Sequence, residues 1–219
     1  MFGRIFVTAL AAGFIAGLFI WGAHMVKAVP LILEAETYEA AAGGAAAEVS
    51  PDEGYGRHAY TLITDVITAV GFALMLAAAF ALSGRDVDWR EGLLWGLGGY
   101  AAFSLAPSLG LPPEVPGMQA ADLGQRQAWW LATAAATLAG LGLIFLARPV
   151  LARVLGGALV VLPHLVGAPA QEAASGPLPA ELAAEFVVVS LVTSGLFWLL
   201  LGGAAGYVYR RLGQARTGP

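Results

Sequence analysis

The sequence has no cysteine and few charged residues. Without cysteine, neither a disulfide framework nor a thiolate metal site can form, so a metal would need histidine, carboxylate, thioether or backbone ligands. Charged residues make up 12% of the 219 residues, about half the share that soluble domains carry. The net charge of −4 also argues against nucleic acid as a partner, because binding it requires a basic surface. The composition therefore excludes a disulfide-stapled domain and a nucleic-acid binder, and disfavours a soluble globular protein.

Several catalytic motifs are also missing. The chain contains no G-x-x-x-x-G-K-[ST] phosphate loop, no G-x-S-x-G nucleophile turn and no H-E-x-x-H metal helix. A single carboxylate deep in an apolar segment is poor support for acid–base catalysis, which needs a matched second group. We therefore predict that the protein is not an enzyme, has no catalytic residues and holds no cofactor permanently.

Long apolar runs dominate what remains. Hydrophobic residues make up 58% of the chain, and six segments approach the length of about 20 residues that crosses a bilayer. The first segment exceeds the apolar region of a signal peptide, so we predict a retained helix. The sequence predicts one all-α, polytopic transmembrane helix bundle over residues 1–219. Its spans are expected at 5–29, 58–82, 89–106, 127–147, 150–166 and 182–209, with a flexible outer loop at 40–54.

The basic residues predict the orientation of the bundle. In a six-span chain with both termini in the cytoplasm, eight of the 11 basic residues fall inside and three outside, as the positive-inside rule requires. Most acidic residues then fall on the outer face, where they would attract cations. Asp65 is the carboxylate expected well within a span. Glycines spaced four apart in three segments predict close helix packing: Gly13 and Gly17, Gly92 and Gly96, and Gly202 and Gly206.

Three histidines are candidate metal ligands. His24, His58 and His164 are expected near the outer ends of their spans, and Asp65 lies seven residues after His58, on the same helical face. Imidazole with oxygen ligands suits cobalt, nickel, zinc or manganese. Ligand-type residues inside spans are costly and usually functional. We predict that these four side chains form an outward-facing metal site.

Each candidate also has a structural interpretation. His58 could be an interfacial residue, His24 could hydrogen-bond across helices, and His164 could cap a helix broken by Pro163. Asp65 needs a partner, which Arg57, Arg126, a proton or a cation would supply. These alternatives stay open at the level of the sequence.

Further polar residues lie in the segments between the spans. Glu34 and Glu36 would point to one side if their segment were extended, which suits cation capture. Glu114, in the proline-rich stretch Leu105–Gly117, could brace that loop with Asp122 and Arg126. That stretch and its shorter counterpart LPHLVGAP are expected to cover the metal site. Met118 more simply packs than binds a metal.

The ordered set of segments resembles a known family. LILEAETYE, YTLITDVITAVGFALML, the stretch GLPPEVPG followed by RQAWW, LPHLVGAP and LFWLLLG together resemble CbtA-type cobalt transporter subunits over nearly the whole chain. The resemblance implies import of Co²⁺ for cobalamin synthesis across the bacterial inner membrane. It also implies a small single-span partner, CbtB, with a histidine-rich motif.

The chain departs from the family pattern in its first outer loop. Relatives often carry histidines there, whereas AAAGGAAAEVSPDEG has none, and many are expected to have Asn in place of Asp65. The hypothesis from the sequence is a transporter importing a divalent metal, Co²⁺ or alternatively Ni²⁺. The alternative is a membrane scaffold or metal-sensing subunit that docks a partner and transports nothing. A homo-oligomer is compatible with both.

Overall fold

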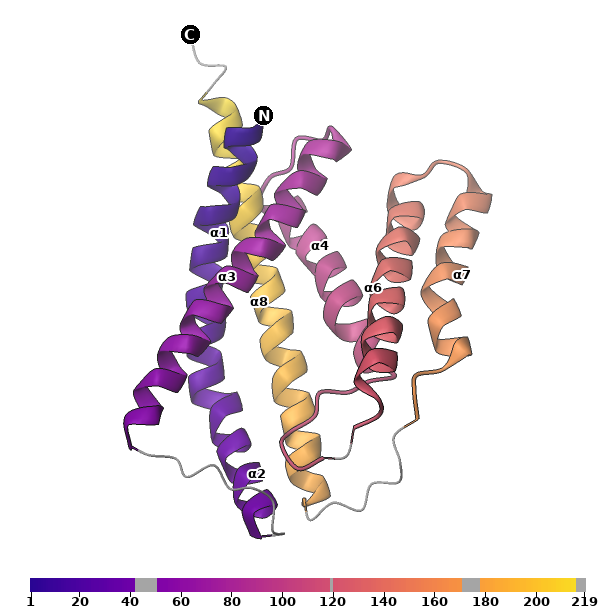
Figure 1. Ribbon diagram of the computed structural model, residues 1–219. Helices are drawn as coiled ribbons and strands as arrows, with labels where there is room; N and C mark the ends of the chain where they lie inside the picture. The colour runs from indigo at the N-terminus through magenta and orange to yellow at the C-terminus, as the bar shows by residue number, and fades with distance from the viewer. Residues whose placement is uncertain (42–50, 119, 171–177, 216–219) are drawn as a thin grey trace. The chain divides into compact units, whose positions relative to one another are not determined.

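A computed structural model describes residues 1–41, 51–118, 120–170 and 178–215. Within these ranges the chain is helical, without strands, and forms six continuous helical segments (Figure 1). The prediction of an all-helical bundle is confirmed, with six helical segments where about six spans are predicted. The segments are α1(Phe2–Ala23) with η1(His24–Ala28) and α2(Val29–Ala41); α3(Pro51–Ser83); α4(Trp89–Tyr100) with η2(Ala101–Leu105) and α5(Ala106–Ser108); α6(Leu123–Leu146); α7(Val150–Val166); and α8(Ala180–Gln214).

The first helix is longer than predicted. Pro30 was expected to end the first span, but helix continues through it as α2 to Ala41. Of the expected outer loop at 40–54, residues 42–50 lie outside the described part, and α3 begins at Pro51. By contrast, the fifth predicted span, Val150–Val166, coincides with α7.

Two π-helical turns explain how helix continues through proline. A proline has no N–H and its ring collides with the carbonyl four residues earlier. In η1 and η2 the backbone widens instead, so that Val29 N–H bonds His24 O and Ala106 N–H bonds Ala101 O. Each π-turn ends two residues before a proline, Pro30 or Pro107. Such turns are uncommon and often occur at functional sites.

Four stretches of the described chain are long and apolar enough to cross a membrane, and Val150–Val166 is a shorter apolar helix of 17 residues. The four are Phe2–Ala41, His58–Ser83, Leu123–Leu146 and Ala180–Gln214. Many large apolar side chains on these helices are exposed, for example Phe6, Phe14 and Leu131. An outward-facing apolar surface of this kind is what a lipid environment requires, so the chain is a multi-pass membrane protein.

The helices form two compact units. The first comprises the described parts of Met1–Val29, Ala47–Leu97 and Val192–Pro219, and the second those of Pro30–Ala46 and Gly98–Leu191. Glycines set the helix contacts in the first unit. A Cβ on Gly13 would lie 2.5 Å from Val70 Cα, and one on Gly17 would lie 2.7 Å from Val66 Cα. The absent side chains therefore let α1 and α3 pack backbone against backbone, as predicted.

A second glycine contact joins α4 to α8. A Cβ on Gly92 would collide with the carbonyl of Gly202, and one on Gly96 would collide with that of Trp198. Aromatic rings pack beside this crossing, with Phe80 and Tyr209 edge to face at a centroid distance of 5.6 Å. The predicted glycine pairs thus contribute close packing in the first unit.

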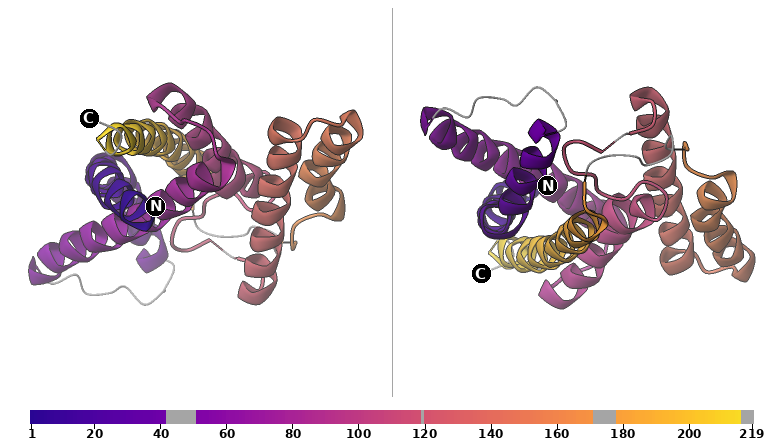
Figure 2. Two further views of the ribbon diagram at one scale, coloured as in Figure 1. Left: turned by 90° about the horizontal axis from the view of Figure 1, so that it is seen from above. Right: turned by 90° about the horizontal axis from the view of Figure 1, so that it is seen from below.

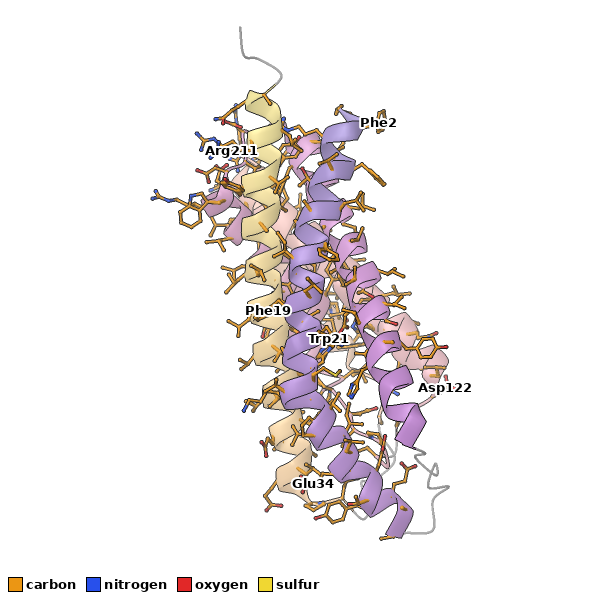
Figure 3. All side chains as sticks on the ribbon, turned by 90° about the vertical axis from the view of Figure 1, so that its left-hand side faces the viewer. Phe2, Phe19, Trp21, Glu34, Asp122 and Arg211 are labelled. Atoms are coloured by element: carbon orange, nitrogen blue, oxygen red, sulfur yellow. The ribbon has the colours of Figure 1, made fainter. Side chains whose placement is uncertain are left out.

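The start of α1 and the end of α8 lie at the same end of the first unit (Figures 1 and 3). Arg4 Nε donates to Tyr209 O at 2.7 Å, and its guanidinium lies 3.5 Å from the centroid of the Tyr209 ring. Seen along the bundle, α1 runs beside the C-terminal half of α8 (Figure 2). This arrangement agrees with both termini on one side of the membrane. Which side that is stays a prediction.

The second unit contains a hairpin of α6 and α7. Gly140 and Gly156 face each other, and a Cβ on either would lie 2.6 Å from the other's carbonyl oxygen. A separate apolar cluster joins α2 to the proline-rich loop and to the start of α8. Its buried members are Leu31, Ala35, Val115 and Leu182. Met118 packs against this cluster, in agreement with its predicted packing role.

Candidate cation site

A histidine and an aspartate meet inside the first unit. His24 Nδ1, on η1, lies 3.0 Å from Asp65 Oδ2, on α3. The side chains of His24 and Asp65 are 33% and 14% exposed, so the carboxylate is largely enclosed. Both residues lie in helices that are apolar enough to span a membrane. An ionisable pair at such a position is costly and is usually kept for function.

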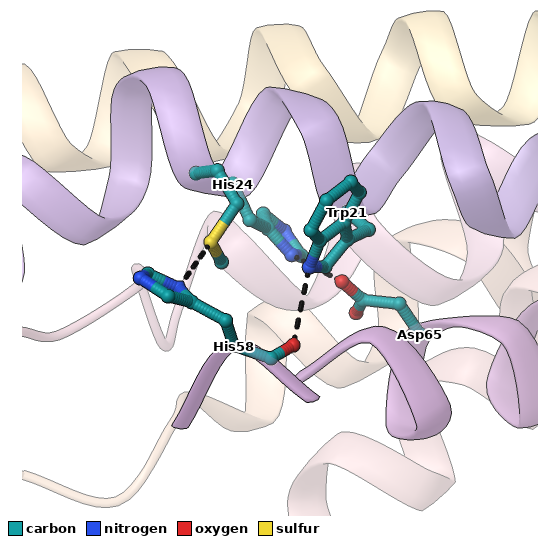
Figure 4. Close-up of polar contacts among 5 residues, drawn as sticks. Trp21, His24, His58 and Asp65 are labelled. Carbon is teal, nitrogen blue, oxygen red and sulfur yellow. Dashed lines mark hydrogen bonds and ion pairs between the residues drawn. The ribbon is translucent and has the colours of Figure 1, made fainter. Parts of the chain in front are cut away.

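His58, the second histidine of this region, lies on α3 seven residues before Asp65, nearer the start of that helix. His58 Nδ1 is 2.8 Å from Met25 Sδ, and the indole N–H of Trp21 donates to His58 O at 3.2 Å. Figure 4 shows these side chains in the space between the two helices. Two successive residues of η1, His24 and Met25, therefore each contact a polar side chain of α3.

The hydrogen bonds indicate which ring atoms could bind a metal. A neutral imidazole that donates Nδ1–H to a carboxylate keeps its Nε2 lone pair for a ligand bond. In this arrangement Asp65 would orient His24 rather than bind the metal itself. The His58 ring, with Nδ1 on a weak sulfur acceptor, likewise keeps Nε2 available. The two helices thus offer imidazole nitrogen, thioether sulfur and carboxylate oxygen.

The π-turn is followed by a proline. Because Pro30 has no N–H, it donates no hydrogen bond to a carbonyl of the preceding turn. That turn is η1, which carries His24 and Met25. In the described residues no three histidine, aspartate or glutamate side chains stand together as a metal-binding group. The arrangement is therefore two side-chain pairs rather than a closed metal cage.

His164 has a different environment. It lies in the last turn of α7, directly after Pro163, and belongs to the second unit. Its ring meets Trp129 edge to face at a centroid distance of 5.9 Å. The Trp129 indole donates to Pro163 O at 3.3 Å, which fastens the proline turn to α6. That His164 joins the other histidines around one metal stays a prediction.

Glu34 and Glu36 lie in the second unit, on α2. The interpretation that depended on an extended segment is wrong, because Val29–Ala41 is helical. Residues two apart on a helix are rotated by about 200° from each other and do not share a side. Glu34 is exposed, and Ala35 between them is buried in the apolar cluster. Their role in cation capture is untested.

The predicted brace of the proline-rich loop is present. Arg126 donates to Glu114 Oε2 at 2.6 Å, and the Glu114 side chain is 11% exposed. Asp122 caps α6 by accepting the N–H of Gln125 at 3.0 Å. Arg126 therefore pairs with Glu114, while Asp65 has His24 as its partner.

Two residues of the candidate site were missed in the sequence. Met25 and Trp21 sit in an apolar run where nothing distinguishes them from lipid-facing residues. Their contacts depend on how α1 is aligned with α3, which the pairs Gly13–Val70 and Gly17–Val66 fix. Met25 and His58 continue the same antiparallel alignment. The usable signal was the adjacency of Met25 to His24.

The comparison with protein families gives a match over nearly the whole chain. The family model described as "Probable cobalt transporter subunit (CbtA)" matches residues 2–210. No curated protein and no solved structure matches the chain significantly. The match covers every helix named above except the last residues of α8.

Proposed function

Because the chain belongs to the CbtA family of probable cobalt transporter subunits, we propose that it imports a divalent transition-metal cation, Co²⁺ first, across the bacterial inner membrane. The observation that carries the proposal is the His24–Asp65 pair, 3.0 Å apart inside the helices α1–η1 and α3. Cobalt is the cargo, and it binds transiently. Ni²⁺ has the same ligand preferences and is the main competitor.

The two side-chain pairs in the first unit, His24 with Asp65 and Met25 with His58, suit transient binding. A closed cage of three or more fixed ligands would hold a metal firmly, whereas a transported ion must also leave. His24 Nε2, His58 Nε2 and the Met25 thioether would replace part of the hydration shell of the ion. Asp65 offsets its charge and keeps the His24 ring in the ligand tautomer. His164, Glu34 and Glu36, the other ligands predicted from the sequence, belong to the second unit, and their part in binding the ion stays a prediction.

The chain carries no nucleotide-binding motif, so the energy for uptake comes from the membrane potential or from a partner. With the interior negative, one elementary charge gains about 2.3 kcal/mol per 100 mV, and a divalent ion gains twice that. The family description as a subunit implies a partner. We propose a small single-span CbtB-like protein with a histidine-rich segment that delivers the metal.

Uptake of radioactive cobalt into proteoliposomes tests this proposal. The full chain is reconstituted alone and with a potential imposed, and the natural chain is compared with Asp65→Ala and Asp65→Asn. Asp65→Ala removes the acceptor for the His24 ring and is expected to lower uptake about tenfold to a hundredfold, the usual cost of losing such a partner. Asp65→Asn keeps an oxygen acceptor and should retain part of the uptake.

Asp86→Ala is the matched control, because Asp86 lies between α3 and α4, away from His24. It should leave uptake unchanged. Equal uptake by the natural chain and Asp65→Ala would overturn the site. Absence of any flux in the natural chain, with and without the partner, would favour the alternative of a scaffold or sensing subunit.

A further inference from the structure

A pocket of about 260 Å³ opens where α4 begins and α8 ends, within the first unit. It lies at the end of the unit where α1 begins and α8 ends, and Figure 3 labels Phe2 and Arg211 there. Nothing in the proposed cation transport uses this pocket. Its lining residues are Asp88, Trp89, Tyr207, Arg210, Arg211 and Gln214.

The acidic residue of the pocket, Asp88, has hydrogen-bond and ion-pair partners that balance its negative charge. Asp88 Oδ1 accepts the backbone N–H groups of Arg90 at 2.8 Å and Glu91 at 3.0 Å, and Oδ2 accepts from Arg210 at 3.2 Å. The backbone hydrogen bond from Glu91 contributes most to lowering the pKa of Asp88, and Arg210 lowers it further. Asp88 therefore stays ionised and orients Arg210, rather than adding an unbalanced negative charge.

Each of the remaining polar side chains of the pocket carries at least one N–H or O–H donor. Arg211 has its guanidinium 5.4 Å from the centroid of the Tyr207 ring, which places it over that ring. In the described residues no ion pair of Arg211 is found, so its positive charge is not balanced as that of Arg210 is. Two guanidinium groups, a phenol, an indole and an amide around one hollow make up a donor set for an anion with several oxygens.

The aromatic residues favour a lipid over a dissolved anion. Trp89 and Tyr207 are each about half exposed, at 48% and 50%, although they are large and apolar. Such rings gather at the level of the headgroups in membrane proteins. Beyond the pocket, α4 continues with exposed Leu94 and Leu97, which offer an apolar surface for an acyl chain.

We propose that this pocket binds the phosphate group of an anionic phospholipid. Arg211 and Arg210 pair with the phosphate oxygens, while Tyr207 and Trp89 hold the glycerol region at the interface. Basic pockets between membrane helices bind anionic headgroups by this chemistry. The proposal is independent of cobalt transport, since it concerns the opposite end of the first unit from His24 and Asp65.

Native mass spectrometry of the full chain in detergent tests the proposal. The protein is titrated with phosphatidylglycerol and, separately, with phosphatidylcholine. We expect phosphatidylglycerol to bind preferentially, and Arg211→Gln to weaken it about fivefold, the usual worth of one basic residue near a membrane surface. Arg211 is exposed, so the variant should fold normally, which its melting temperature verifies.

Arg85→Gln is the matched control. Arg85 is also exposed and lies in the segment joining α3 to α4, but it does not line the pocket, so its loss removes the same charge elsewhere. Phosphatidylglycerol binding by Arg85→Gln should equal that of the natural chain. An equal loss in both variants would show only general charge attraction and would overturn the site. Displacement of the lipid by millimolar inorganic phosphate would overturn the assignment to a lipid.

Discussion

His24 and His164 both lie close to a proline, one in each unit, yet their surroundings differ. His24 sits at the start of a π-turn before Pro30 and contacts the carboxylate of Asp65. His164 follows Pro163 in a helix without a π-turn and meets the edge of the Trp129 ring. A carboxylate fixes the tautomer and raises the basicity of an imidazole, whereas an indole ring packs against it. The side chain beside each histidine therefore indicates its role. His24, beside Asp65, is arranged to bind a cation, whereas His164, beside Trp129, is packed.

The largest expected effect is the difference in cobalt uptake between a variant of His24 and a variant of His164. His24→Gln removes the ring that Asp65 orients and should lower cobalt uptake in proteoliposomes about tenfold to a hundredfold. His164→Phe keeps an aromatic ring against Trp129 and should retain most of the uptake, with a similar melting temperature. If His164→Phe lost as much uptake as His24→Gln, His164 would be a ligand, as the sequence predicts.

The next largest effect is the loss of stability when a glycine at a helix contact is replaced by alanine. Both units contain such contacts. Gly156→Ala places a methyl group 2.6 Å from Gly140 O and should destabilise the chain by about 1–3 kcal/mol. Gly157→Ala, one residue on, meets nothing within 4 Å and should be neutral or slightly stabilising. Thermal unfolding in detergent measures both variants.

The same comparison in the first unit is Gly13→Ala against Gly22→Ala. A methyl group at Gly13 would meet the backbone of Val70, whereas one at Gly22 would meet nothing within 4 Å. Similar melting temperatures for Gly13→Ala and Gly22→Ala would contradict the account of α1 and α3 packing. Because Gly13 sets the alignment that brings His24 to Asp65, its substitution should also reduce cobalt uptake.

Much of the fold follows from local patterns in the sequence. Val150–Val166 is an apolar run bounded by Pro149 and Gly167, and both ends of α7 are predicted correctly. The glycine pairs predict close contacts because their spacing of four keeps both on one helix face. Helix through Pro30 could not be predicted, since it depends on a π-turn whose extra residue relieves the clash of the proline ring.

Only part of the candidate site could be predicted from the sequence. His58 and Asp65 share a helix face by their spacing, and the structure places both against η1. That Asp65 meets His24 rather than Arg126 depends on the alignment of two distant helices, which is a tertiary property. Met25 carries no charge, and only the alignment of the two helices brings its sulfur to His58.

The smallest expected effect concerns Asp88, at the other end of the first unit from His24. The backbone N–H of Glu91 holds the pKa of Asp88 below its usual value of 3.8. A carboxyl group with a lowered pKa in the folded state stabilises the fold above its unfolded pKa. That stability is lost as the pH falls through the folded value. Asp88→Ala should therefore lower the melting temperature slightly at pH 7, and the difference should shrink as the pH falls below 3.8.

The difference in melting temperature between the natural chain and Asp88→Ala should therefore change with pH. A difference that stays constant as the pH falls would contradict the role of the ionised Asp88 side chain as the cap of α4. The control is Asp86→Ala in the same segment, which removes a carboxyl group but leaves the hydrogen bonds of Asp88 in place.

X-ray absorption at the cobalt edge tests the central claim most directly. The purified full chain is loaded with one equivalent of Co²⁺, and the imidazole rings around the metal are counted from their scattering. The account predicts imidazole ligands in the natural chain, one fewer in His24→Gln, and no change in His164→Phe. An unchanged imidazole count in His24→Gln would contradict the assignment of the cation site to the His24–Asp65 pair.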